Sequence, residues 1–406
     1  MDRTVVIGGG PAGMMAALTS AMNGKKVTLI EKNEKLGKKL YITGKGRCNL
    51  SNFSMGEDFL KNIVTNKKFL YASMSAFSSE DTYSFFENNG LKLKVERGNR
   101  VFPESDKASD VTKILNKLLI NYGVDIRLNT IVNDIDVLDG QVKGVKTSDG
   151  YVEASSVICA TGGVSYPLTG STGDGFNFAK GLGHSLIDLR PSLVGIEIKE
   201  QFCKQMQGLS LKNVRLTAKT CGKTVFSEMG EMLFTHFGVS GPIVLSCSAY
   251  INRLNLKDVE LSIDLKPALS NDVLDQRLIR EFSQNNNKTI STVLGFLLPK
   301  SMVEPFCEFA NLKNNKTCSE ITLKERRAII ESLKEFRLTP IKLRPIDEAI
   351  VTSGGVNVKE INPKTLESKI VKGLYFVGEV LDVDALTGGF NIQIALSTGY
   401  LAGMNA

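Results

Sequence analysis

The first 31 residues of this 406-residue chain constrain its fold more than any other segment, because they place a glycine-rich turn between two apolar runs. The run Val5 to Ile7 precedes the turn Gly8-Gly9-Gly10-Pro11-Ala12-Gly13, and a helix-like stretch follows. The second apolar run, Val27 to Ile30, ends at the acidic residue Glu31. The order strand, glycine turn, helix, strand and acid is that of a dinucleotide-binding unit.

Each polar or glycine position of this unit has a distinct physical task. Gly8 allows a tight turn, Gly10 leaves room for a pyrophosphate beside the backbone, and Gly13 lets the helix pack closely on the sheet. The helix N-terminus then faces the phosphates. Glu31 lies where a carboxylate can bind the two hydroxyls of a ribose, whereas a basic residue there would indicate a 2′-phosphate. An ordinary α/β unit with a glycine turn is the alternative.

Composition bounds the kind of protein. A chain with 42% hydrophobic and 23% charged residues is globular, and its length predicts two or more domains. The net charge of +7 permits an anionic partner without requiring one. Seven cysteines without a CxxC pair indicate reduced thiols and a cytoplasmic protein, and only two histidines argue against a metal site. No apolar run approaches the length of a membrane span, so we expect no membrane association.

The middle of the chain predicts a change of architecture. An amphipathic helix is expected over Asp110 to Tyr122, followed by a strand at Val124 to Leu128 and a meander of short strands up to Ala154. The apolar run Ser156 to Ala160 predicts a buried parallel strand that ends at a ligand-binding edge, Thr161-Gly162-Gly163. From about Arg190 the pattern changes to alternating strands and then to polar helices, which predicts an inserted α+β unit.

The C-terminal segment favours a flavin over a nicotinamide as the bound dinucleotide. Gly373 to Glu379 predicts another buried strand that ends at a glycine and an acid, and Gly388 to Asn391 opens a final helix. FAD takes contacts from both ends of a discontinuous domain: Glu379 would bind the ribitol, and the final helix would point its N-terminus at the isoalloxazine. A second Rossmann turn is not evident, because Gly170 to Gly175 follows Pro167 rather than a strand.

The segment Thr43 to Asn52 concentrates further chemistry. Its glycines permit close backbone approach, and Arg47 with the neighbouring lysines Lys38, Lys39 and Lys45 could neutralise phosphate. Cys48 could supply a proton or a thiolate, or it could be a small buried packing residue, which is the commoner role of a cysteine.

These motifs resemble those of the bacterial YhiN/BaiN/RdsA-type flavoproteins along essentially the whole chain. The resemblance is carried by GGGPAG at Gly8, GKGRCNLSN at Gly44, ATGGVSYPLTGSTGDG at Ala160, GEMLFTHFGVSGP at Gly230, VTSGGV at Val351 and GEVLDVDALTGGFNIQ at Gly378. One departure is Lys45, where the family more often has glycine.

The resemblance implies a fold, a cofactor and a set of site residues. The fold class is α/β, with a discontinuous glutathione-reductase-type FAD-binding Rossmann domain at residues 1–190 and 345–406, a small β-barrel-like insert at 191–268 and a helical insert at 269–344. FAD is expected to bind tightly and non-covalently, with NAD(P)H as a transient reductant. The residues expected to contact FAD are Gly8, Gly10, Pro11, Ala12, Gly13, Glu31, Lys32, Lys39, Gly46, Arg47, Cys48, Asn49, Val132, Thr161, Gly162, Gly378, Glu379, Gly389, Phe390, Asn391 and Ile392.

The expected reaction is reduction of an activated carbon–carbon double bond by hydride from NAD(P)H through the flavin. Family members are associated with reduction of uridine to dihydrouridine in large-subunit ribosomal RNA, which makes ribosomal RNA an expected partner; for uridine, hydride goes to C6 and a proton to C5. Cys48 and His236 are the candidate proton donors. The alternatives are a small-molecule reductase or oxidase acting on a steroid, enone or amine, and a flavin redox sensor without turnover.

Overall fold

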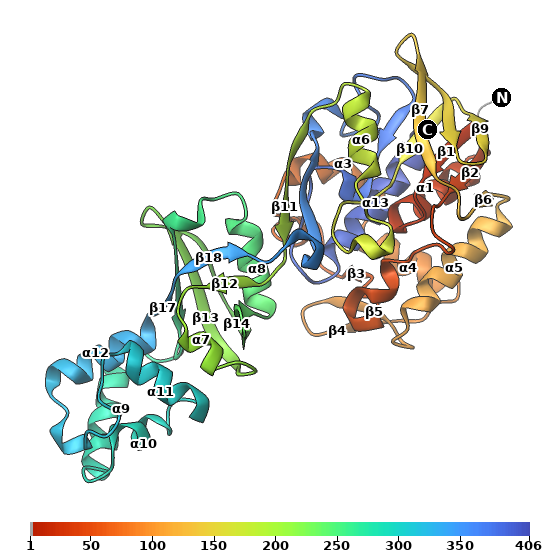
Figure 1. The fold of residues 1–406 in the computed structure, drawn as a ribbon. Helices are drawn as coiled ribbons and strands as arrows, with labels where there is room; N and C mark the ends of the chain where they lie inside the picture. Colours follow the sequence, from red (N-terminus) through yellow and green to blue (C-terminus); the bar gives the residue numbers. More distant parts are fainter. Residues whose placement is uncertain (1–2) are drawn as a thin grey trace. The chain divides into compact units, whose positions relative to one another are not determined.

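The computed structural model describes residues 3–406, which divide into two compact units (Figure 1). Within the described residues, unit 1 comprises 3–192 and Ile346–Ala406, and unit 2 comprises Leu193–Pro345. The chain therefore leaves unit 1 after Ser192 and returns to it at Ile346.

A five-stranded parallel sheet forms the centre of unit 1. Its strand order is β20-β10-β1-β2-β6, with β1 in the middle. Val5 and Val6 of β1 are completely buried, as expected for a sheet covered on both faces. The bounds are β1 Arg3–Ile7, β2 Lys26–Ile30, β6 Asp125–Arg127, β10 Ser156–Cys159 and β20 Leu374–Phe376. Strands from the two ends of the chain thus share one sheet, so the α/β Rossmann-type fold expected from the sequence is confirmed.

Helices α1 (Pro11–Met22) and α13 (Phe390–Asn405) pack against each other, and both are apolar around most of their circumference (Figure 1). Two glycines of α13 make this close approach possible. A Cβ atom at Gly399 would lie 2.3 Å from the carbonyl oxygen of Ala12, and one at Gly403 would lie 2.6 Å from that of Ala16. The last helix therefore rests directly on the helix that follows the glycine turn.

Smaller antiparallel sheets surround the parallel sheet in unit 1. The meander expected before Ala154 is present as β7 Val132–Leu138, β8 Gln141–Thr147 and β9 Gly150–Glu153. A second sheet has the order β3-β5-β4, with β3 Ser51–Asn52, β4 Leu93–Glu96 and β5 Arg100–Pro103. β11 (Leu186–Ser192) pairs with β19 (Val351–Val356). The other helices of unit 1 are α2 Gly56–Leu60, α3 Tyr71–Ala76, α4 Ser79–Asn88, α5 Ala108–Asn121 and α6 Asp174–Gly181.

Unit 2 contains a seven-stranded antiparallel sheet with the order β17-β16-β13-β14-β15-β12-β18. The two end strands belong to one chain segment, because only Thr339 separates β17 (Phe336–Leu338) from β18 (Pro340–Leu343). β17 pairs with β16, and β18 pairs with β12. The chain thus passes from one end of the sheet to the other through Thr339, and β18 then pairs with β12, the first strand of unit 2 in the chain. Its other strands are β12 Ile196–Ile198, β13 Ser210–Thr220, β14 Lys223–Thr235, β15 Gly238–Ser240 and β16 Val259–Asp264.

The helices of unit 2 lie mostly between β16 and β17 in the chain. The structure differs from the expectation of a helical insert up to residue 344, because the last helix ends at Lys334 and the residues from Phe336 to Leu343 are strands. The alternation of buried Phe336, exposed Arg337 and buried Leu338 is the strand signal in this segment. The helices are α7 Phe202–Gln205, α8 Pro242–Ile251, α9 Asn271–Gln284, α10 Ile290–Leu294, α11 Lys300–Phe309 and α12 Leu323–Lys334.

None of the helices within residues 3–406 combines the length and the apolar composition that crossing a bilayer requires.

Candidate functional site

The glycine turn between β1 and α1 is shaped by contacts that admit no side chain. Gly8 has a φ of +103°, and a Cβ atom there would lie 2.6 Å from the carbonyl oxygen of Ala160 at the end of β10. A Cβ atom at Gly13 would lie 1.9 Å from the carbonyl oxygen of Gly8. Both glycines are thus required by packing, and they hold α1 tightly against the carboxyl edge of the sheet.

Gly10 differs from these two glycines because, apart from its neighbours in the chain, no atom lies within 4 Å of the position that its Cβ would take. It is the N-cap of α1, and Pro11 occupies the first turn of that helix. The N-terminal N–H groups of a helix favour anionic ligands. Open space at this position, in a turn that is otherwise closely packed, fits a pyrophosphate group.

Glu31 is joined to the glycine turn by hydrogen bonds. Its carboxylate accepts from the backbone N–H of Gly9 at 2.7 Å and from that of Asn33 at 2.8 Å, and the side chain is 8% exposed. The carboxylate therefore lies at the end of β2 beside the turn, as expected for a ribose-binding acid. Lys32 points elsewhere: its ammonium group forms a 2.7 Å ion pair with Asp174 at the start of α6 and also donates to Thr172.

A cavity of about 480 Å³ opens beside Lys32. The β7 strand and the residue before it form one wall, which includes Val132, and helix α6 forms another, which includes Phe178. Mixed apolar and polar walls of this kind suit a flat heterocycle with polar edges. The full lining is Lys32, Ile131, Val132, Asn133, Asp134, Ile135, Asp174, Asn177, Phe178, Gly181 and Leu182.

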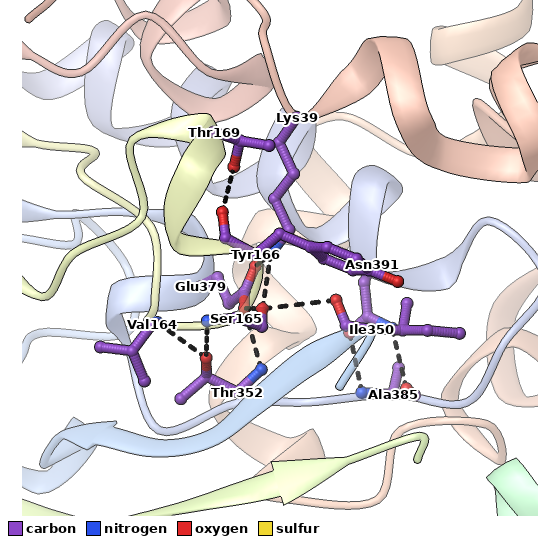
Figure 2. Close-up of polar contacts among 10 residues, drawn as sticks. All are labelled: Lys39, Val164, Ser165, Tyr166, Thr169, Ile350, Thr352, Glu379, Ala385 and Asn391. Carbon is purple, nitrogen blue, oxygen red and sulfur yellow. Dashed lines mark hydrogen bonds and ion pairs between the residues drawn. The ribbon is translucent and has the colours of Figure 1, made fainter. Parts of the chain in front are cut away.

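Glu379 lies after β20 at the same edge of the parallel sheet, and it forms the centre of a polar network (Figure 2). Its carboxylate pairs with the ammonium group of Lys39 at 2.7 Å, and each of these two side chains is 21% exposed. The hydroxyl of Ser165 and the backbone N–H of Thr352 each donate to it at 2.9 Å. Lys39 also donates to the Ser165 hydroxyl at 2.7 Å.

The charges of this network determine its protonation state. Burial alone would raise the pKa of the Glu379 carboxyl, but the positive charge of Lys39 and the hydrogen bonds that the carboxylate accepts outweigh burial and lower the pKa. Glu379 is therefore ionised at neutral pH beside a cation. A neutral ion pair with further hydrogen-bonding capacity suits polyol hydroxyls, which both donate and accept.

The N-terminus of α13 is a second helix end, besides that of α1, that could face a ligand. Gly388 and Gly389 precede it with positive φ values, and a Cβ atom at Gly389 would lie 2.2 Å from the carbonyl oxygen of Ser51. Phe390 is buried and packs edge-on against Phe59, with ring centroids 5.0 Å apart. Ile392 is half-buried.

The side chain of Asn391 is engaged with the backbone that precedes the helix. Its Oδ1 accepts from the N–H of Ala385 at 3.0 Å, and its Nδ2 donates to the Ala385 carbonyl at 2.8 Å (Figure 2). The first turn of α13 is thus held in place by Asn391, whose contribution to a ligand would come from its backbone N–H.

The Thr161 to Gly163 edge follows β10 and meets the Glu379 network. Gly162 has a φ of +74°, which favours glycine. A Cβ atom at Gly163 would lie 2.3 Å from the Thr352 hydroxyl and 2.8 Å from the Glu379 carboxylate. Gly378 is also required, since its φ is +72° and its Cβ would approach that of Ala12 to 2.9 Å.

Arg47 is engaged by carboxylates instead of being available for phosphate. Its guanidinium pairs with Glu96 and, at 2.7 Å, with Asp106, and it lies 4.2 Å over the ring of Phe102. Gly46 has a φ of +88°, which allows the loop to turn toward Arg47. This placement supports a structural role for Arg47 and does not support the phosphate neutralisation expected from the sequence.

Cys48 and Asn49 follow Arg47 in very different surroundings. Cys48 is completely buried, and burial raises the pKa of its thiol to about 12. This surrounding favours the packing role that the sequence left open, because a proton donor must reach its substrate. The Oδ1 of Asn49 is buried and has no hydrogen-bond partner within residues 3–406. A buried acceptor without a partner is costly, so Asn49 fits a residue that binds a ligand.

His236, the second candidate proton donor, belongs to unit 2. It is exposed, and its ring contacts that of Phe237 edge-on at 5.1 Å. Over residues 3–406, no cluster of His, Cys, Asp or Glu has the arrangement that a metal ion needs.

Ser165 and Thr352 also belong to the site, although neither was predicted from the sequence. Thr352 accepts, through its hydroxyl, from the N–H groups of Val164 at 2.9 Å and Ser165 at 3.2 Å (Figure 2). Both residues lie inside motifs that carry the family resemblance, YPLTG with its preceding serine and VTSGGV, and this was the available signal. The first motif follows β10 of the parallel sheet, but Ser165 lies beyond the glycines of that edge, and Thr352 lies in β19, which pairs with β11 outside the parallel sheet.

The parallel sheet, the glycine turn at its carboxyl edge and the two acids that follow β2 and β20 define an FAD-binding Rossmann-type protein of the α/β class. The model of the family described as "HI0933-like protein Rossmann domain" matches residues 2–405. The chain belongs to this family of FAD-dependent oxidoreductases, as its motifs indicated, and it is an enzyme.

Two relatives and one solved structure give the range of similarity. A 3-dehydro-bile acid delta(4,6)-reductase from Clostridium scindens is 33% identical over 100% of this chain and 99% of its own length. A ribosomal RNA dihydrouridine synthase from Haemophilus influenzae is 30% identical over 100% of this chain and 98% of its own length. A 3-ketosteroid-delta4-(5alpha)-dehydrogenase from Rhodococcus jostii has a TM-score of 0.54 at 13% identity, covering 100% of this chain and 96% of that one, and this likeness concerns the fold alone.

Proposed function

We propose that unit 1 binds FAD non-covalently along the carboxyl edge of its parallel sheet. The observation that carries this proposal is the open space at Gly10, in a turn where Gly8 and Gly13 leave none. The pyrophosphate would lie over Gly10 and the first turn of α1, and Glu31 would bind the adenosine ribose. The adenine would enter the cavity beside Lys32 and Val132.

The other half of FAD would contact the Glu379 network and the final helix. Lys39 and Glu379 offer a donor and an acceptor to the ribitol hydroxyls, and Ser165 keeps the pair in position. The N-terminus of α13, after Gly389, would face the pyrimidine edge of the isoalloxazine, where its dipole stabilises negative charge. The unpartnered Oδ1 of Asn49 supports a further contact from the loop before β3.

The proposed reaction is reduction of an activated carbon–carbon double bond, with NAD(P)H as the reductant. When bound, the flavin supplies hydride transfer to and from carbon, and the protein supplies position and charge. The names of both relatives indicate such a reduction. Dihydrouridine is uridine without its C5–C6 double bond, and a delta(4,6)-reductase acts on double bonds of a bile acid.

Uridine in large-subunit ribosomal RNA is the substrate that we favour, and a steroid-like enone is the second candidate. Charge distribution supports the first, because unit 2 contains 22 of the 50 basic and 16 of the 43 acidic residues of the chain and therefore carries +6 of the net +7. The 33% identity to the bile acid reductase supports the second. Cys48 and His236 are the two candidate proton donors: Cys48 belongs to unit 1 but is buried, and His236 is exposed but belongs to unit 2.

The test is an anaerobic experiment on the purified holoenzyme. The flavin is reduced with NADPH or NADH and then mixed with ribosomal RNA from cells that lack the gene, while flavin absorbance is followed and dihydrouridine is measured by mass spectrometry. Reoxidation with new dihydrouridine is the expected result. Reoxidation by a 3-keto-4,6-diene steroid and not by RNA would select the second candidate, and a reduced flavin that neither compound reoxidises would refute both.

A further inference from the structure

The turn between β4 and β5 is tied to the glycine turn that precedes α13. We call residues 97–100 (Arg97, Gly98, Asn99 and Arg100) the basic turn. The side-chain Nδ2 of Asn52 donates to the carbonyl oxygen of Gly98 at 3.0 Å and to that of Gly388, also at 3.0 Å. One amide group thus joins the basic turn to the segment where the isoalloxazine would lie.

The hydrogen bonds of Asn52 make this connection rigid. Asn52 is 2% exposed, and its Oδ1 accepts from the backbone N–H of Ser54 at 3.1 Å and from the Ser54 hydroxyl at 2.6 Å. The backbone N–H of Phe53 donates to the carbonyl of Asn99 at 2.7 Å, which fixes the turn at a second point. A buried amide with every donor and acceptor engaged holds its neighbours in a single arrangement.

The basic turn presents exposed positive charge. Arg97 and Arg100 are exposed, and within residues 3–406 neither forms an ion pair. Arg100 lies opposite Glu96 in the hairpin and donates through Nε to the Arg97 carbonyl at 3.0 Å. The nearby carboxylates are already engaged, because Arg47 pairs with Glu96 and Asp106, and Lys94 also pairs with Asp106.

The neighbouring surface extends this positive charge. Loop 44–47 and segment 92–107 together contain seven basic side chains and three acidic ones, Glu96, Glu104 and Asp106. Lys45 and Lys92 are exposed like the two arginines. Phe53 follows Asn52, is half-buried and packs edge-on against Tyr83 with ring centroids 5.3 Å apart, so part of an aromatic ring accompanies the charge.

We propose that the basic turn binds the phosphate backbone of single-stranded RNA and thereby holds the target base beside the flavin edge. Several separate cations spread over an exposed turn suit a chain of phosphates better than one phosphate group, and arginine binds phosphate oxygens in a bidentate manner. A partly exposed aromatic ring beside such charges is typical of single-strand binding. This inference rests on the proposed function for the position of the flavin, and it assigns Asn52 as a positioning residue.

The test measures binding of a short labelled single-stranded RNA to the holoenzyme by fluorescence anisotropy over a range of salt concentrations. Loss of two phosphate contacts lowers the slope of log affinity against log salt by about 1.4 for a single strand. We expect this fall in the R97Q/R100Q variant, with affinity lowered at least about tenfold at low salt, and a slope close to wild type in R97K/R100K. The matched control is K67Q/K68Q, which removes two exposed charges of the same unit at η2 (Lys67–Leu70) and keeps the wild-type slope.

The outcomes separate this inference from the proposed function. An R97Q/R100Q variant that binds RNA with wild-type affinity and slope would overturn the inference. A variant in which only flavin reduction by NADPH becomes slower would also overturn it, because the turn would then bind the nicotinamide dinucleotide. The R97Q/R100Q variant should retain its flavin spectrum, because neither arginine is buried. RNA binding that depends on the turn, without reoxidation of the flavin by RNA, would support the surface while refuting the proposed substrate.

Discussion

The same substitution, glycine to alanine, should affect different properties at two positions of one turn. Gly13→Ala places a Cβ atom 1.9 Å from the carbonyl oxygen of Gly8, so α1 must move away from the turn by about 1 Å. Gly10→Ala places a Cβ atom where no atom lies within 4 Å. The first change therefore acts on the fold, and the second acts only on a ligand that occupies the open space.

The magnitudes follow from this geometry. Overpacking at Gly13 should lower the free energy of unfolding of the apoprotein by about 1–3 kcal/mol. At Gly10, which has an ordinary φ of −77°, the weaker N-cap offered by alanine costs some tenths of a kcal/mol, and the reduced freedom of the unfolded chain returns a similar amount. Apoprotein stability should then change by less than about 0.5 kcal/mol, while FAD should bind at least about tenfold more weakly, or 1.4 kcal/mol.

The assay combines urea unfolding of the apoproteins with titration of FAD into each, followed by quenching of flavin fluorescence. The wild-type chain is the reference for both measurements. A Gly10→Ala protein with wild-type FAD affinity would refute the position of the pyrophosphate over α1, and a Gly13→Ala protein of unchanged stability would refute the argument from close packing.

The remaining predictions concern the Glu379 network and the two candidate proton donors. The free energy of unfolding of the wild type should fall on acidification. The pKa of Glu379 is lowered in the fold, so this carboxyl stabilises the fold while it is ionised and loses that contribution as it becomes protonated. Lys39→Met should lower the free energy of unfolding at pH 7 by about 1–3 kcal/mol and reverse its dependence on pH between pH 7 and 5. The K39M/E379Q double variant should remove this pH dependence, which urea unfolding measures. A K39M protein with the pH dependence of the wild type would contradict the role of the pair. Exposed Cys221 should react with iodoacetamide at pH 8 while buried Cys48 stays unmodified, as peptide mass spectrometry would show; rapid labelling of Cys48 would contradict its burial. If His236 donates the proton, His236→Gln should slow reoxidation of the flavin by substrate and leave its reduction by NADPH unchanged. Stopped-flow absorbance separates the two steps, and an unchanged rate of reoxidation would remove His236 as a candidate.

The sequence predicted those parts of the fold in which local pattern and context agree. The parallel strands at β1, β2 and β10, the meander that begins at Val132 and the helix that begins after Gly389 follow from apolar runs, hairpin turns and glycine positions that act over a few residues. The segment from Phe336 to Leu343 was missed because two three- or four-residue strands after a long helical stretch leave too short a pattern.

The candidate site shows a similar division. Glu31 lies beside the glycine turn because both belong to one βαβ unit of fixed geometry. The partners of Lys39 and Arg47 could not be predicted, since Glu379 is 340 residues from Lys39 and Glu96 is 49 residues from Arg47. A basic side chain before a glycine loop can serve a ligand or an acid elsewhere in the chain, and only the tertiary structure distinguishes the two.

The point at which unit 2 enters the chain has a consequence for the order of folding. In unit 1, Ser192 pairs with Val351 across β11 and β19, so this pair must close a loop of 158 residues. In unit 2, Ile196 pairs with Leu343 across β12 and β18. Once unit 2 has folded, only roughly ten residues of free chain remain between Ser192 and Val351, which lowers the entropic cost of closure by about 2 kcal/mol. The middle of the chain thus prepares the two parts of unit 1 for closure, and β19, with Thr352 beside Glu379, reaches its place most readily after unit 2 is complete.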